Sequence, residues 1–136
     1  MILNICDVVY YGRFYCDAVY EYETRWWLDR KDFKVYSTEE LLSRFGFEDY
    51  HAIEVCYDLI PVFKTDIIAL EKEFIKKYTG GGNIDEYDCL YDRKFKEYID
   101  RKLLIQEWYE FERRKLIEDA ILWCQFYKIP YVVCEK

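Results

Sequence analysis

The sequence predicts an α+β fold, in which a small antiparallel sheet packs against several helices and the longest helix lies near the C-terminus. Three observations support this class. Two runs rich in β-branched and aromatic residues flank a polar turn at 29–32. The segment 65–78 has apolar residues at helical spacing, and the segment 103–127 continues that spacing before a short β-rich tail. We expect the N-terminal hairpin and this C-terminal strand to form the sheet.

The length of the chain predicts a single domain over residues 1–136, and no internal repeat interrupts it. Hydrophobic residues make up 52% and aromatic residues 21% of the chain, which supplies a core and excludes disorder. The formal net charge of −7 argues against binding to nucleic acid or to anionic membranes, because such binding depends mainly on cationic side chains.

The cysteines and the N-terminal residues predict a cytoplasmic protein. The six cysteines are scattered and form no C-x-x-C pair, so they are interpreted as reduced core residues rather than metal ligands. The N-terminal residues lack the basic lead and the cleavage site of a signal peptide. No apolar run approaches the length of about 18 residues that a membrane span requires.

The first predicted elements are a helix and a hairpin. Residues 5–20 fit either a helix that begins after Asn4 or an alternating strand; the helix is favoured, with Gly12 as the place for a break. The runs Arg25–Leu28 and Phe33–Tyr36 then form the two strands of the hairpin.

A capping sequence follows the hairpin. Ser37 or Thr38, with Glu40 close behind, predicts a short helix that runs to about Arg44 and is ended by Gly46. Residues 47–63 contain Pro61 and alternate only partly, which favours an irregular or edge element over a central strand.

The helix at 65–78 begins at Thr65 and ends before three consecutive glycines at 80–82. A phosphate-binding loop would need Gly-Lys-Ser/Thr, whereas acidic residues follow here, so the glycines are interpreted as a helix end and linker. Asn83 or Asp85 should cap the next helix, which runs to about Ile99. The neighbouring carboxylates are interpreted as helix-start charges rather than cation ligands: Asp85, Glu86, Asp88 and Asp92.

The predicted C-terminal helix at 103–127 has an apolar arc wider than one contact surface requires. One strip has the spacing of a core-facing stripe: Ile105, Tyr109, Leu116, Ala120, Trp123 and Tyr127. Charged and polar residues lie opposite: Glu107, Glu110, Arg114, Glu118 and Gln125. A second apolar strip needs a cover, either the 5–20 segment or a partner: Leu104, Trp108, Phe111, Leu122 and Phe126. Pro130 ends the region, and the strand Tyr131–Cys134 follows.

The residues that could take part in catalysis or metal binding form no convincing site in the sequence. His51 is the only histidine, which excludes a histidine pair for metal binding. Ser37 and Ser43 lack a nucleophile-elbow motif, and Cys56 lies five positions from His51 without any sign of contact. We therefore predict no catalytic, cofactor-binding or metal-binding residues.

The pair Trp26-Trp27, with Arg25, Arg30 and Lys31 nearby, is compatible with base stacking on single-stranded nucleic acid, although the net charge disfavours it. Side chains alternate along a strand, so one tryptophan of the pair must face away from the other. That one is either exposed or covered by a second layer.

Two blocks of the sequence resemble a known family. The first block is Trp27-Leu28-Asp29, which enters the hairpin. Separately, the stretch Ile60 to Phe63 is similar to the family's link into the following helix. The other block comprises Trp108-Tyr109-Glu110-Phe111, Ala120-Ile121-Leu122-Trp123-Cys124 and Ile129-Pro130-Tyr131. Together they resemble the bacterial uncharacterised protein family 0158. The resemblance implies a cytosolic, single-domain bacterial protein of unknown activity and supplies no catalytic residues; where its members have a glycine in the hairpin turn, this chain has Lys31-Asp32.

These observations favour a non-enzymatic protein-interaction or self-associating module with an aromatic surface. A homodimer is the default partner, since two-fold homodimers are the commonest oligomers. The alternatives are a small-molecule binder or enzyme with an acidic and tyrosine-lined pocket, and an acidic decoy of nucleic acid. The predicted interaction surface consists of Trp108, Phe111, Leu122, Phe126 and Trp26.

Overall fold

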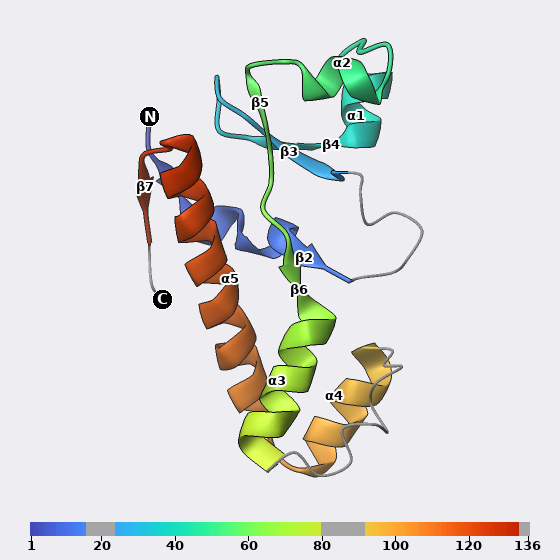
Figure 1. Ribbon diagram of the computed structural model, residues 1–136, viewed down its shortest axis with the longest axis vertical. Coiled ribbons are helices and arrows are strands. Elements are labelled where there is room, and N and C mark those ends of the chain that lie inside the picture. The colour runs from blue at the N-terminus through green and yellow to red at the C-terminus, as the bar shows by residue number, and fades with distance from the viewer. Residues whose placement is uncertain (16–23, 80–91, 134–136) are drawn as a thin grey trace.

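A computed structural model of the protein describes residues 1–15, 24–79 and 92–133, and it has the predicted α+β architecture. A sheet with two short helices lies at one end and two longer helices lie at the other, and the longest helix runs from that second end toward the sheet (Figure 1). These longer helices are α3 (Ile67–Thr79), α4 (Asp92–Arg101) and α5 (Ile105–Tyr127). The sequence predicts α3 and α5, although each begins two residues later than predicted. The predicted caps of the helix before Ile99, Asn83 and Asp85, lie outside the described residues.

The sheet contains the predicted hairpin. Strand β3 (Trp26–Asp29) lies at its centre and pairs antiparallel with β4 (Val35–Ser37) on one side and with β5 (Leu59–Pro61) on the other. Strand β5 therefore lies at an edge of the sheet, which confirms the prediction of an edge element at Pro61. A proline is tolerated there because an edge strand needs its hydrogen-bond ladder on one side only.

The expectation that the C-terminal strand completes this sheet is wrong. Strand β7 (Tyr131–Val132) instead pairs in parallel with β1 (Leu3–Asn4). The chain leaves α5 through Lys128, which adopts the left-handed conformation with φ 57°. This turn directs the following strand along the side of α5 to the N-terminus, where Figure 1 shows β7 and the N-terminal end side by side.

The prediction of a helix over residues 5–20 is also wrong for residues 5–15, the part of this segment that the structure describes. Two 3₁₀ turns, η1 (Ile5–Asp7) and η2 (Val9–Gly12), precede the short strand β2 (Arg13–Phe14), which pairs in parallel with β6 (Thr65–Asp66). Asn4 does cap the first turn, accepting a hydrogen bond from the Cys6 N–H at 3.1 Å, and the predicted break falls at Gly12.

A close approach explains why a glycine stands at position 12. A Cβ atom at Gly12 would overlap the ring of Phe63, so the turn packs against that ring only because the residue has no side chain. Residues 16–20 of the predicted helix lie outside the described part of the chain.

The capped helix α1 (Thr38–Ser43) follows the sequence prediction closely. Ser37 accepts a hydrogen bond from the Glu40 N–H and Glu40 accepts one from the Ser37 N–H, both at 3.1 Å, which completes a capping box. Gly46 takes φ +75° just after the helix. The sequence reading missed α2 (Tyr50–Glu54), which Asp49 caps through the Ala52 N–H at 2.9 Å.

Helix α5 joins two hydrophobic clusters. Its C-terminal half packs under β3 and β5 and against the N-terminal turns, with Leu116, Ala120 and Trp123 buried as predicted. Its N-terminal half packs against α3 and α4. A third, smaller cluster fills the space between the sheet and the helices α1 and α2.

Candidate functional site

The two ends of the predicted interaction surface have opposite environments. Trp108 is 0% and Phe111 is 3% exposed, so both belong to the core rather than to a surface. Phe74 of α3 and Phe95 of α4 cover Trp108, with ring centroids 5.4 Å and 4.6 Å away. The cover of Trp108 is therefore supplied by α3 and α4, and not by the described part of the 5–20 segment. Tyr109, which the periodicity places in the core, is 46% exposed.

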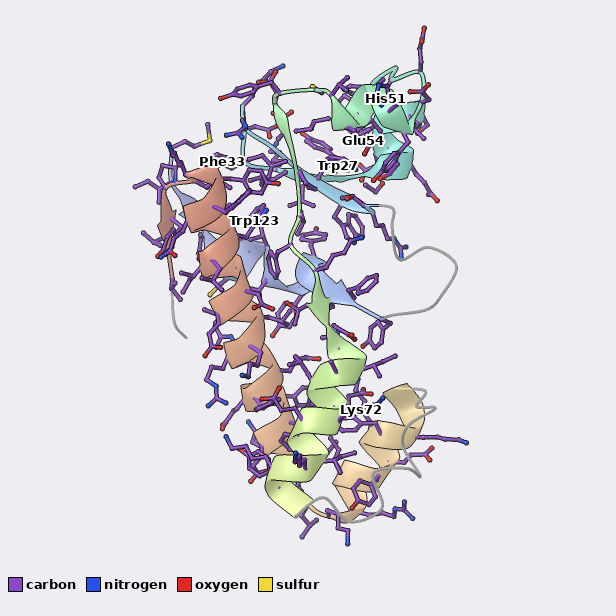
Figure 2. All side chains as sticks on the ribbon, viewed as in Figure 1. Trp27, Phe33, His51, Glu54, Lys72 and Trp123 are labelled. Atoms are coloured by element: carbon purple, nitrogen blue, oxygen red, sulfur yellow. The ribbon has the colours of Figure 1, made fainter. Side chains whose placement is uncertain are left out.

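The other end of that surface is exposed. Leu122 is 63% and Phe126 is 77% exposed, and the two side chains lie one helical turn apart on α5. Figure 2 labels Trp123, which lies between them in sequence and turns inward, where its indole N–H donates to the Pro61 carbonyl at 2.8 Å.

A shallow, open hollow of about 430 Å³ adjoins these side chains. We call this region the α5 surface; it consists of the hollow's lining residues Phe63, Lys64, Asp119, Leu122, Trp123, Phe126 and Tyr127. The ring of Phe126 lies 4.9 Å from that of Tyr127, and the ring of Phe63 lies 5.6 Å from that of Trp123. Asp119 is fixed at the rim, because it accepts a hydrogen bond from the Thr65 hydroxyl at 2.7 Å.

Trp26, the fifth residue of the predicted surface, is half-buried and does not line this hollow. Its ring stands edge-on to that of Tyr11 at 4.8 Å, and the Arg25 guanidinium lies 5.6 Å from its centroid. Trp27 is 2% exposed and donates to the Thr38 hydroxyl at 2.9 Å. The two tryptophans thus face opposite sides of the sheet, as the alternation along a strand requires.

A buried ion pair connects the N-terminal strand to α5, and the sequence reading missed it. The Arg13 guanidinium donates to the Glu112 carboxylate at 3.0 Å, although Glu112 is only 3% exposed. The signal that could have revealed it was a carboxylate four residues after Trp108 inside an apolar strip. A charge in that place needs a cationic partner, but the sequence does not say which one.

The residues weighed for chemistry have structural roles or lie apart from one another. Ser37 caps α1, and the Ser43 hydroxyl donates to the Glu39 carbonyl at 2.8 Å. The side chain of His51 is 79% exposed, and its Nδ1 lies 3.9 Å from a carboxylate oxygen of Glu54. Figure 2 labels both residues on α2. Within residues 1–15, 24–79 and 92–133, no group of three or more potential ligands could hold a metal ion. The predicted helix-start carboxylates Asp85, Glu86 and Asp88 fall outside those ranges, as does the side chain of Asp92.

Cys124 illustrates the structural role predicted for the cysteines. Its side chain is fully buried, and this burial raises the pKa of the thiol to about 11, which disfavours the nucleophilic thiolate. Cys6 and Cys56 are half-buried, and neither is in a disulfide.

None of the described helices combines the length and the apolar character needed to cross a bilayer. Of the predicted interaction surface, the part that stays exposed is the C-terminal end of α5, with Leu122 and Phe126. Comparisons of the chain with protein-family models, with curated proteins and with solved structures each found no match, so the resemblance of its two sequence blocks stays a prediction.

Proposed function

We propose that this protein is a non-enzymatic interaction module that pairs with a second copy of itself through the α5 surface. The observation that carries the proposal is the exposure of Leu122 and Phe126, at 63% and 77%, on a helix whose other large apolar side chains are mostly covered. Two large apolar side chains on adjacent turns beside a hollow are typical of a helix that a partner covers.

The shape of the α5 surface suits a two-fold arrangement. In such an interface the same patch serves both copies, so a protruding group must find a recess close to its own position. Here Phe126 protrudes directly beside the hollow that it also lines. The ring of one copy can enter the recess of the other, and the reverse contact follows from symmetry.

The charges at the rim are also self-complementary. Lys64 and Asp119 both line the hollow, and they carry opposite charges. A two-fold axis that passes between the hollows brings Lys64 of one copy toward Asp119 of the other. Like charges do not face each other in that arrangement.

Energy estimates indicate a dimer that dissociates on dilution. Fully burying a leucine or phenylalanine side chain contributes about 1.5–3 kcal/mol, so the four side chains of a dimer contribute at most roughly 6–12 kcal/mol. Association costs about 4–15 kcal/mol in lost translational and rotational freedom. Because the two ranges overlap, the rest of the interface decides the affinity, and the dimer should be sensitive to a single truncation.

The same proposal places the protein in the cytoplasm. What supports this location is the state of Cys6, Cys56 and Cys124, which are thiols in the described part of the chain, since reducing compartments keep cysteines in this form.

Sedimentation velocity tests the pairing over about two decades of protein concentration. The wild-type protein should shift from monomer to dimer with increasing concentration. Phe126→Ser should raise the concentration of half-dimerisation at least about ten-fold, a loss of about 1.4 kcal/mol or more. Val55→Ser is the matched control, because Val55 is 66% exposed but lies on the far side of the sheet from α5, at the end of α2.

A monomer at every concentration would contradict the proposal. So would equal weakening by the two substitutions, because the α5 surface would then have no special part in the association.

A further inference from the structure

A second and larger hollow is lined by residues of β2 and of the β3–β4 hairpin. Figure 1 shows β2 and β3 near the middle of the molecule. The volume of this hollow is about 880 Å³, within the upper part of the range of small-molecule sites. Residues from β2, β3, the start of α1 and the segment between β5 and β6 line it. This cavity shares Phe63 and Lys64 with the α5 surface but is otherwise separate from it.

The described lining of the cavity is positively charged in a chain with a formal net charge of −7. Three cationic residues, Arg13, Arg25 and Lys64, line it together with one carboxylate, that of Glu39. Arg13 is already paired with the Glu112 carboxylate. Arg25 is the cation of this lining that an anion can pair with most directly, because its guanidinium forms no ion pair with any residue that the structure describes.

Aromatic rings lie next to two of these cations in the lining of the cavity. The Lys64 ammonium lies 5.1 Å from the ring centroid of Phe14, and the Arg25 guanidinium lies 5.6 Å from that of Trp26. Tyr11 and Tyr15 add rings with hydroxyl groups, and the Tyr15 hydroxyl accepts a hydrogen bond from Arg13 at 3.2 Å. A planar ring can stack on such side chains while an attached anionic group pairs with the cations.

We propose that this cavity binds a small anion that carries an aromatic ring, such as a nucleoside phosphate or an aromatic carboxylate. The proposal goes beyond self-association and does not depend on it. A small ligand fits the charge balance better than a nucleic-acid strand does, because a polyanion would also meet the acidic remainder of the chain. One anionic group needs only the local positive charge of the cavity.

Isothermal titration calorimetry with two probes tests the proposal. Adenosine monophosphate and 4-hydroxybenzoate each combine a ring with an anion, and they separate a phosphate from a carboxylate as the recognised group. Adenosine and inorganic phosphate supply the ring alone and the charge alone. We expect saturable binding of at least one probe to the full-length protein, and binding of adenosine and phosphate at least about ten-fold weaker.

Two charge reversals identify the site. Arg25→Glu should weaken binding of the successful probe at least about ten-fold. Lys34→Glu is the matched control, because Lys34 is an exposed cation of the same hairpin that does not line the cavity. The two variants have the same net charge, and thermal unfolding followed by circular dichroism establishes that both are folded. Self-association of Arg25→Glu should match that of the wild type, which separates this test from that of the α5 surface.

Three results would overturn the proposal. The first is the absence of saturable binding for both probes. The second is equal weakening by Arg25→Glu and Lys34→Glu, which would show a general charge effect. The third is binding of an oligoadenylate RNA at least about ten-fold tighter than the mononucleotide, which would identify a nucleic-acid surface in place of a small-molecule site.

Discussion

Residues of similar chemistry have very different environments in this protein. Trp108 and Phe126 both belong to the second apolar strip of α5, yet the first is 0% and the second 77% exposed. The difference arises because α3 and α4 pack only along the N-terminal half of α5. A property as local as ring exposure thus depends on where a neighbouring helix ends.

Cys124 offers a test at this scale through pH. Burial raises the pKa of its thiol from 9.0 to about 11, so the unfolded chain loses the proton at a lower pH than the folded one. Below about pH 9 both states hold the proton and stability is unaffected. Between pH 9 and 11 ionisation favours the unfolded chain, and by about pH 11 the free energy of unfolding should fall by about 2 kcal/mol from this group.

Urea unfolding of the wild type and of Cys124→Ala measures that effect. Other groups titrate in the same range, but they do so in both proteins. The stability advantage of the wild type over Cys124→Ala should therefore shrink as the pH rises from about 8 to about 11. An advantage that stays constant would show that the thiol is not shielded from ionisation by its burial.

Elements with strong local signals form as the sequence predicts. The hairpin, α1 and α3 each begin or end at residues whose side chains satisfy backbone groups or favour a turn. Short elements without such periodicity, among them α2 and the two 3₁₀ turns, are not predicted by the sequence. Five or fewer residues give too little periodicity to separate a helical turn from a strand.

The capping box of α1 can be tested directly. Ser37→Ala removes the hydroxyl that accepts the Glu40 N–H, and it should lower the free energy of unfolding by about 1 kcal/mol. Ser43→Ala serves as the control, because the Ser43 hydroxyl bonds the Glu39 carbonyl within the helix and should matter by less than about 0.5 kcal/mol. Urea denaturation gives both values. Equal effects would mean that the cap does not stabilise the start of α1.

On the scale of the whole molecule, α5 links the two ends of the fold. It has 23 residues and is therefore about 35 Å long, enough to enter the cluster with α3 and α4 and the cluster under the sheet. Lys115 of α5 also reaches Glu73 of α3 at 3.5 Å. A rigid element that is shared by two clusters couples their unfolding.

Trp108→Ala tests this coupling and, with it, the prediction of a single domain. The substitution should lower the free energy of unfolding by about 3–5 kcal/mol, because Trp108 is fully buried. The remaining tryptophans, Trp26, Trp27 and Trp123, all lie toward the sheet, so their fluorescence reports on the end opposite to the substitution.

Circular dichroism reports mainly on the long helices. In a single cooperative unit both signals should shift together to the same lower midpoint. Fluorescence that keeps the wild-type midpoint while the helical signal shifts would divide the molecule into two independently stable parts.

The sequence by itself determined the α+β class, the hairpin, the capping box and the span of the long helix, because these follow from periodicity and from contacts within a few residues. The tertiary structure alone decided which aromatic side chains of α5 stay exposed and which are covered by Phe74 and Phe95. It also decided that β7 joins β1 and that β5, not the tail, completes the sheet. These outcomes depend on where distant segments return in space, and one strip of apolar residues is equally well buried by any of several neighbours.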